Sequence, residues 1–233
     1  MTRAKHFVRV AGPSASARAN GNDAPLGNVV LRKMANELAA SALEAAGTAA
    51  PTLPPPGPSG FYRLNVGCGP PRHEGELGVD LHPTEARDVP GDLLNLPFPD
   101  GSAEFIRLDH ILEHLPLRKV ATALWEAFRV LAPGGTIRVG IPDMVAVCRA
   151  YAEITDLATK ARAQRYIYGG QHHDGEYHLS GWDSATMGDQ LRAAGFVDVA
   201  CEDDTERGQD LTIKLTARKP GEDSPPPGYA GPT

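Results

Sequence analysis

The stretch "RLNVGCGPP", residues 63–71, joins a short apolar strand to a turn that has glycine at alternate positions. Gly67 and Gly69 allow the backbone to turn tightly and to come close to a ligand. In open sheets of parallel strands, ligands bind beyond the carboxyl ends of the strands. The stretch therefore predicts the first strand of an α/β fold and a ligand site directly after it.

The phosphate fingerprint of dinucleotide-binding proteins is incomplete at this turn. Arg72 stands where that fingerprint has its third glycine. The segment between Gly69 and Leu77 is also too short for a long helix that could bind pyrophosphate at its N-terminus. We therefore expect no dinucleotide at this site.

Further apolar segments follow the first one, and helical patterns separate several of them. The seven expected strands are "FYRLNV" (61–66), "ELGVDL" (76–81), "ARDVPGDL" (86–93), "AEFIRLD" (103–109), "GTIRVGIPD" (135–143), "FVDVACED" (196–203) and "DLTIKLTARK" (210–219). Helical spacing is found over 117–131, where "APGG" should end the helix, over 144–168 and over 184–194 with Asp183 as N-cap. The pattern predicts a doubly wound, mostly parallel seven-stranded sheet, covered on both faces, with a C-terminal antiparallel hairpin.

The two ends of the chain differ in composition from its centre. We expect residues 1–60 to form a flexible extension that carries one amphipathic helix at about 26–46 and a proline-rich linker. Residues 61–219 should form the folded domain, and residues 220–233 a disordered tail.

Composition excludes several classes of partner. The formal net charge is −6 and no basic cluster is present, which argues against nucleic acid. No apolar run reaches the roughly 18–20 residues that span a bilayer, and the N-terminus lacks a secretory signal. Cys68, Cys148 and Cys201 lie too far apart for a disulfide framework, which indicates a reducing, cytoplasmic setting. A homodimer is allowed for.

Acidic residues follow the second and third expected strands. Asp80 ends "GVDL", where a carboxylate can accept hydrogen bonds from both hydroxyls of a ribose. Asp92 in "GDLLNLPF" could accept a hydrogen bond from an adenine amino group. A glycine turn with these two acids predicts a nucleoside site without a phosphate cradle.

From Arg63 to Lys219 the chain resembles a class I S-adenosylmethionine-dependent methyltransferase of the small bacterial type-11-like group. The resemblance rests on "LNVGCG", "GVDL", "GDLLNLPFPDGSAEFIRLDHILEHL" and "AFRVLAPGGTIRVGIPD" in that order. The chain departs from the group at Asn65, where many members have an acid, and at Pro70, where many have glycine or alanine. The resemblance implies S-adenosylmethionine as cofactor, held by Asn65, Gly67, Cys68, Gly69, Asp80, Leu81, Asp92, Leu93, Asp109 and His110.

The motif "HILEH", residues 110–114, has the histidine spacing of a metalloprotease helix. It follows a strand directly, however, and Pro116 comes two residues after His114, so no long zinc-binding helix fits. The resemblance places Asp109 and His110 beside the methionine part of the cofactor. We therefore interpret the motif as a look-alike and expect no metal ion.

The segment "YIYGGQHHDGEYHLSGW", residues 166–182, is the richest in chemistry, and the resemblance implies a loop over the acceptor. A histidine suits a general base for a hydroxyl acceptor, with His178 first, His173 second and His110 as a further catalytic candidate. A solvated polar loop and a metal site built from His172, His173, Asp174 and His178 remain alternatives. Trp182 could pack against Met187 or stack on the acceptor.

The sequence thus predicts an enzyme that moves a methyl group to a small molecule, with a hydroxyl of a sugar or secondary metabolite as the expected acceptor. One alternative is a non-catalytic module that keeps the cofactor fold. The other is a metal-dependent hydrolase that uses "HILEH" or the histidines at 172–178.

Overall fold

The computed structural model describes residues 51–69, 73–202 and 211–222. The helix expected at 26–46 and the tail beyond residue 222 lie outside the described residues. No helix in these three ranges has the length and apolar character needed to cross a membrane.

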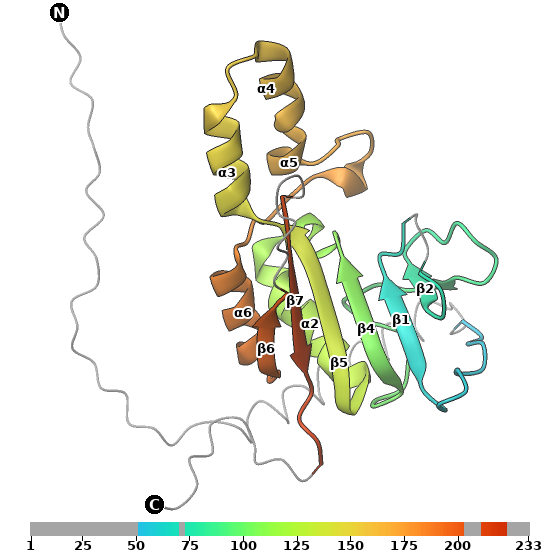
Figure 1. Ribbon diagram of the computed structural model, residues 1–233. Helices are drawn as coiled ribbons and strands as arrows, with labels where there is room; N and C mark the ends of the chain where they lie inside the picture. Colours follow the sequence, from blue (N-terminus) through green and yellow to red (C-terminus); the bar gives the residue numbers. More distant parts are fainter. Residues whose placement is uncertain (1–50, 70–72, 203–210, 223–233) are drawn as a thin grey trace, which may run out of the picture. The chain divides into compact units, whose positions relative to one another are not determined.

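A seven-stranded sheet forms the centre of the domain, in the order β3-β2-β1-β4-β5-β7-β6 (Figure 1). The strands are β1 (Tyr62–Val66), β2 (Leu77–Asp80), β3 (Val89–Pro90), β4 (Ala103–Asp109), β5 (Leu131–Pro142), β6 (Val197–Cys201) and β7 (Thr212–Arg218). β7 pairs antiparallel with both β5 and β6, while the pairs formed by β1 to β5 are parallel. The predicted fold class, with its C-terminal antiparallel pair, is confirmed.

One face of the sheet is apolar and packs against helices. Alternate residues of β5, namely Ile137, Val139 and Ile141, are fully buried, as period-two side chains on one face should be. Helices α2 (Leu117–Val130) and α6 (Ser184–Ala193) lie behind the sheet in Figure 1 and cover this face.

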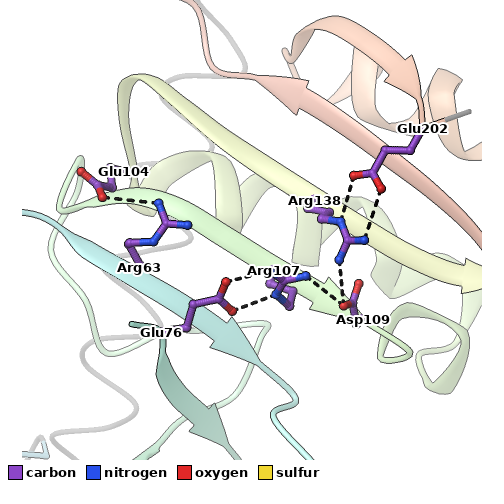
Figure 2. Close-up of polar contacts among 7 residues, drawn as sticks. All are labelled: Arg63, Glu76, Glu104, Arg107, Asp109, Arg138 and Glu202. Atoms are coloured by element: carbon purple, nitrogen blue, oxygen red, sulfur yellow. Dashed lines mark hydrogen bonds and ion pairs between the residues drawn. The ribbon is translucent and has the colours of Figure 1, made fainter. Parts of the chain in front are cut away.

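The opposite face of the sheet is charged. It carries Arg63, Arg107, Asp109 and Arg138, joined by ion pairs with acids from neighbouring segments (Figure 2). We expected helices on both faces, but none of the described helices lies on this one. Charge pairing there takes the place of apolar packing.

Three short helices, α3 (Met144–Glu153), α4 (Leu157–Ala163) and α5 (Arg165–Tyr168), lie beyond the carboxyl ends of the parallel strands (Figure 1). The 3-10 helices η1 (Leu112–His114) and η2 (Asp174–Glu176) complete the described elements. These segments therefore surround the edge at which the sequence places the ligand site.

The boundary between α2 and β5 differs from the sequence prediction. We expected "APGG" to end the helix, but α2 ends at Val130 and β5 begins at Leu131. Leu131 pairs with Ala103 and Thr136 pairs with Phe105, so the intervening residues bulge out of the ladder. Gly134 has φ +80°, a conformation that glycine adopts at little cost and that this bulge requires.

The start of α6 matches its prediction. Asp183 is the N-cap, and its side chain accepts a hydrogen bond from the Thr186 backbone at 2.8 Å in a capping box. Trp182 and Met187 are both buried in the core, and Trp182 Nε1 donates to Ser180 Oγ at 3.0 Å. The indole therefore packs inside the domain and does not present a face to an acceptor.

Candidate active site

The turn after β1 has a geometry that lets a ligand come close to the backbone. Gly67 has φ +71°, and its N–H donates to the Val79 carbonyl at 2.8 Å. A Cβ on Gly67 would lie 2.6 Å from Ile111 Cδ1, whereas a Cβ on exposed Gly69 would meet nothing within 4 Å. The turn is therefore tightly packed against Ile111 at Gly67 and open at Gly69. This arrangement fits a ligand that lies against the backbone at Gly69.

The two predicted acids lie at the same edge of the sheet as this turn. β2 pairs with β1 and β3 pairs with β2, and the Gly91 N–H donates to the Asp80 carbonyl at 2.9 Å. Asp80 Oδ1 accepts from His82 N, and Asp92 Oδ1 accepts from Leu94 N, each at 2.9 Å. These local bonds hold both carboxylates in place.

The remaining residues predicted around the nucleoside differ in what they can offer. Leu81 is 63% exposed, which leaves its side chain open for contact with a ring. Leu93 and Cys68 are buried in the domain, so only their backbone groups can reach a ligand. Asn65 is a buried polar residue on β1.

Asp109 and His110 occupy the end of β4, as predicted. Asp109 Oδ2 lies 3.3 Å from Arg107 Nη1 and 3.2 Å from Arg138 Nη1, so its charge is shared between two guanidinium groups (Figure 2). His110 is exposed and has φ +53°, a left-handed conformation that is strained for a residue with a Cβ. Such strain is found most often at functional sites.

The segment that follows Asp92 is anchored by helix α2. Glu126 Oε1 accepts from Leu96 N at 2.7 Å, and Arg129 donates to the carbonyls of Phe98 and Leu96. The carboxylates of Glu126 and Asp100 raise the pKa of Arg129 despite its partial burial. We did not identify this anchor from the sequence, although an acid among the apolar residues of a helix was a usable signal.

The "HILEH" segment does not form a metalloprotease helix. Its last three residues form the short helix η1, and His110 lies outside this helix in the left-handed conformation. His110 Nδ1 lies 3.1 Å from Glu113 Oε1. The two histidines therefore do not share one helix face.

Backbone hydrogen bonds join η1 to the histidine-rich segment. The Glu113 carbonyl accepts from Leu179 N at 2.7 Å and from Ser180 N at 3.1 Å. Ser180 Oγ donates to the Leu112 carbonyl at 3.1 Å. This contact brings His178 to His114, with ring centroids 4.9 Å apart.

The three catalytic candidates have different surroundings. Burial lowers the pKa of half-buried His178, although the nearby Glu113 carboxylate acts in the opposite direction. His173 is exposed and lies 3.4 Å from Glu176. His110 Nε2 lies 3.4 Å from Thr212 Oγ1. His178 and His110 are therefore brought together around Glu113, while His173 lies outside this group.

Two hollows in the described part of the chain lie away from Gly67 and Gly69. One, of about 580 Å³, is open and is lined by Pro116, Leu117, Arg118 and Leu179. The other, of about 320 Å³, lies among α3, α4 and α5 and includes Tyr166 and Leu211.

The strand order and the glycine turn define a Rossmann-like methyltransferase fold. Residues 64–139 match the family described as "Methyltransferase domain". This match confirms the resemblance to class I S-adenosylmethionine-dependent methyltransferases noted in the sequence. Enzymes of this class take their methyl group from S-adenosylmethionine.

Individual relatives are more distant. An uncharacterized 37.1 kDa protein in transposon TN4556 of Streptomyces fradiae is 32% identical over 119 residues, which are 41% of this chain and 34% of that protein. This chain thus spans about a third of that relative.

Solved methyltransferases also resemble this chain. A Thermotoga maritima S-adenosylmethionine-dependent methyltransferase, described as a possible histamine N-methyltransferase, has a TM-score of 0.47 and 19% identity, covering 68% of this chain and 82% of its own. The Burkholderia thailandensis 1,6-didemethyltoxoflavin-N1-methyltransferase, with S-adenosylhomocysteine bound, has a TM-score of 0.45 and 18% identity, covering 70% and 73%.

Proposed function

We propose that this chain binds S-adenosylmethionine and transfers its methyl group to a small-molecule acceptor. The observation that carries the proposal is the arrangement of the turn at 67–69, Asp80 and Asp92 along one edge of the sheet. Backbone hydrogen bonds from Gly67 to Val79 and from Gly91 to Asp80 fix their spacing. The methyltransferase family match supports the same conclusion.

Each end of the cofactor has candidate partners at this edge. Asp80 accepts from the ribose hydroxyls, Asp92 from the adenine amino group, and the exposed side chain of Leu81 packs on the adenine ring. Gly69 admits the cofactor close to the backbone. The backbone groups of Cys68 and Leu93 complete the nucleoside contacts.

The methionine end of the cofactor falls to the residues at the ends of β1 and β4. Asn65 supplies a neutral amide, which can both donate and accept hydrogen bonds. Asp109 and His110 lie beside it at the end of β4. Ion pairs with Arg107 and Arg138 hold the Asp109 carboxylate in place at this position.

The acceptor is proposed to be a hydroxyl of a sugar or secondary metabolite. Its oxygen bonds to the methyl carbon as the sulfur–carbon bond breaks, so the main task of the protein is alignment, which can supply roughly 7–11 kcal/mol. The hydroxyl proton must leave during this step. We assign its removal to the histidines at this edge, with His178 first because it is half-buried beside Glu113.

Mass spectrometry of the purified chain for bound S-adenosylmethionine or S-adenosylhomocysteine tests the proposal most directly. Calorimetric titration with S-adenosylhomocysteine should then give one site per chain, and an acceptor screen should follow. A folded protein that binds neither compound would remove the proposed function.

A further inference from the structure

We propose that Glu113, His114 and His178 form a binding site for one divalent transition-metal ion of the Zn²⁺ type. One ligand atom from each residue lies within 4.8 Å of the other two. Two histidines and one carboxylate are a common ligand set of zinc sites that keep an open position. Ligand atoms about 2.0–2.2 Å from one ion lie closer to each other than 4.8 Å. Side-chain movements of roughly 1 Å would therefore complete the site.

The Glu113 side chain supplies independent support. The residue is 1% exposed, and its Oε2 is buried without a hydrogen-bond partner among the described residues. A buried carboxylate oxygen without a partner costs free energy, and native proteins rarely leave one in this state. A bound cation would compensate this oxygen, while Oε1 keeps its contact with His110.

The His114 ring is oriented as a metal ligand usually is. Its Nδ1 lies 3.1 Å from the Tyr177 carbonyl. A carbonyl can only accept, so the ring donates its Nδ1–H there and Nε2 keeps a free lone pair. Metal-bound histidines almost always have such an outer partner, which fixes the tautomer.

The three ligands come from two segments that the backbone holds together. Leu179 and Ser180 donate to the Glu113 carbonyl, so His178 is fixed beside η1 before any ion binds. His172 and His173 are exposed and do not belong to this group, although the sequence suggested them as ligands. Half of "HILEH" and one histidine of the loop therefore share a site that neither segment forms alone.

Three protein ligands would leave a coordination position open for an oxygen atom. A hydroxyl bound to such an ion loses its proton far more easily than in water. Leu179, the residue after His178, lines a hollow with Leu117, and this hollow could accept an apolar part of the acceptor. This catalytic role of the ion rests on the proposed function, whereas metal binding itself does not. In this role, His178 promotes loss of the hydroxyl proton by holding the ion.

The test uses the full chain, stripped with a chelator and titrated with Zn²⁺ by calorimetry, with metal content measured after desalting. We expect one ion per chain and the visible absorption of tetrahedral coordination after loading with Co²⁺. Glu113→Gln and His178→Gln should each weaken Zn²⁺ binding at least about 100-fold, beyond the roughly 10–100-fold cost of an outer partner. His173→Gln, in the same loop but outside the ligand set, is the matched control.

A wild-type chain that binds less than one Zn²⁺, or a His173→Gln chain that loses as much affinity as His178→Gln, would overturn the site. Circular dichroism without metal shows whether each variant is folded, and the half-buried His178 is the safer substitution if Glu113→Gln unfolds. Titration with S-adenosylhomocysteine separates the two proposals. Zn²⁺ binding without nucleoside binding removes the proposed function alone, and the reverse result removes the metal site alone.

Discussion

Arg107 and Glu76 form a two-bond ion pair on the charged face of the sheet. Arg107 Nε lies 2.8 Å from Glu76 Oε2, and Nη2 lies 2.7 Å from Oε1 (Figure 2). The side chains are only 12% and 4% exposed, and Arg107 also contacts Asp109. The Glu76 hydrogen bonds raise the pKa of Arg107, although burial opposes them. This pair ties the start of β2 to the middle of β4.

Replacement of Arg107 by Met should therefore destabilise the domain. It would leave the Glu76 carboxylate buried without its partner, and breaking a buried pair in this way costs about 3 kcal/mol or more. Urea unfolding followed by circular dichroism measures the change in the free energy of unfolding.

Arg63→Met is the matched control, since Arg63 lies on the same face and also stacks on Phe105. Its pair with Glu104 is 44% and 34% exposed, so its loss should cost no more than about 1 kcal/mol. Equal losses for the two variants would show that the burial of the Glu76 pair has no energetic consequence.

Asp80→Asn should weaken S-adenosylhomocysteine binding about tenfold or more, because hydrogen bonds to a charged group contribute roughly 1.5–3 kcal/mol. The asparagine oxygen can still accept from His82 N, so the turn is retained. Calorimetry provides the affinity. Asp189→Asn on the exposed side of α6 is the control, and an unchanged affinity in Asp80→Asn would exclude the ribose role.

The two glycines of the turn should respond differently to alanine. Gly69→Ala adds a Cβ in open space and should leave the melting temperature unchanged while lowering cofactor affinity, because the methyl group occupies the ligand's position. Gly67→Ala combines φ +71° with a clash at Ile111 and should lower stability by about 1–3 kcal/mol. Thermal unfolding and calorimetry on both variants distinguish these outcomes, and full affinity in Gly69→Ala would place the cofactor elsewhere.

His178→Ala should lower methyl transfer about 10²–10⁴-fold and leave S-adenosylhomocysteine affinity unchanged, because we propose that this residue contacts the acceptor and not the cofactor. His173→Ala, outside the group around Glu113, should keep near-wild-type turnover. Rates are measured with an acceptor identified in the screen. A wild-type rate in His178→Ala would remove this residue from catalysis.

Local patterns were sufficient to predict most of the sheet. Apolar runs such as "FYRLNV" and "AEFIRLD" have the length and bounding turns of strands, and parallel strands bring their carboxyl ends to one edge. This is why Gly67, Asp80 and Asp92 could be grouped from the sequence alone. The start of β5 could not be predicted in this way, because the bulge at "APGG" depends on pairing with β4.

The sequence contains a signal for the charged face of the sheet. Arg63, Arg107 and Arg138 lie on the same face of three neighbouring strands, whereas strands covered on both faces are apolar throughout. The cluster of Glu113, His114 and His178 had no such signal in the sequence. It depends on backbone bonds between η1 and residues 179–180, and no local spacing encodes such a long-range contact.

Asp143, which follows β5, and Trp182, which lies just before α6, meet although 38 residues separate them in the sequence. Met144 N donates to the Trp182 carbonyl at 2.9 Å, and the two segments form a short parallel bridge at Asp143. The segment 144–181 thus begins and ends at adjacent points. It could be exchanged between homologues as one unit without a change in strand order. Substrate preference should be transferred with this segment, provided that the inserted segment also has a histidine at the place where His178 lies beside Glu113.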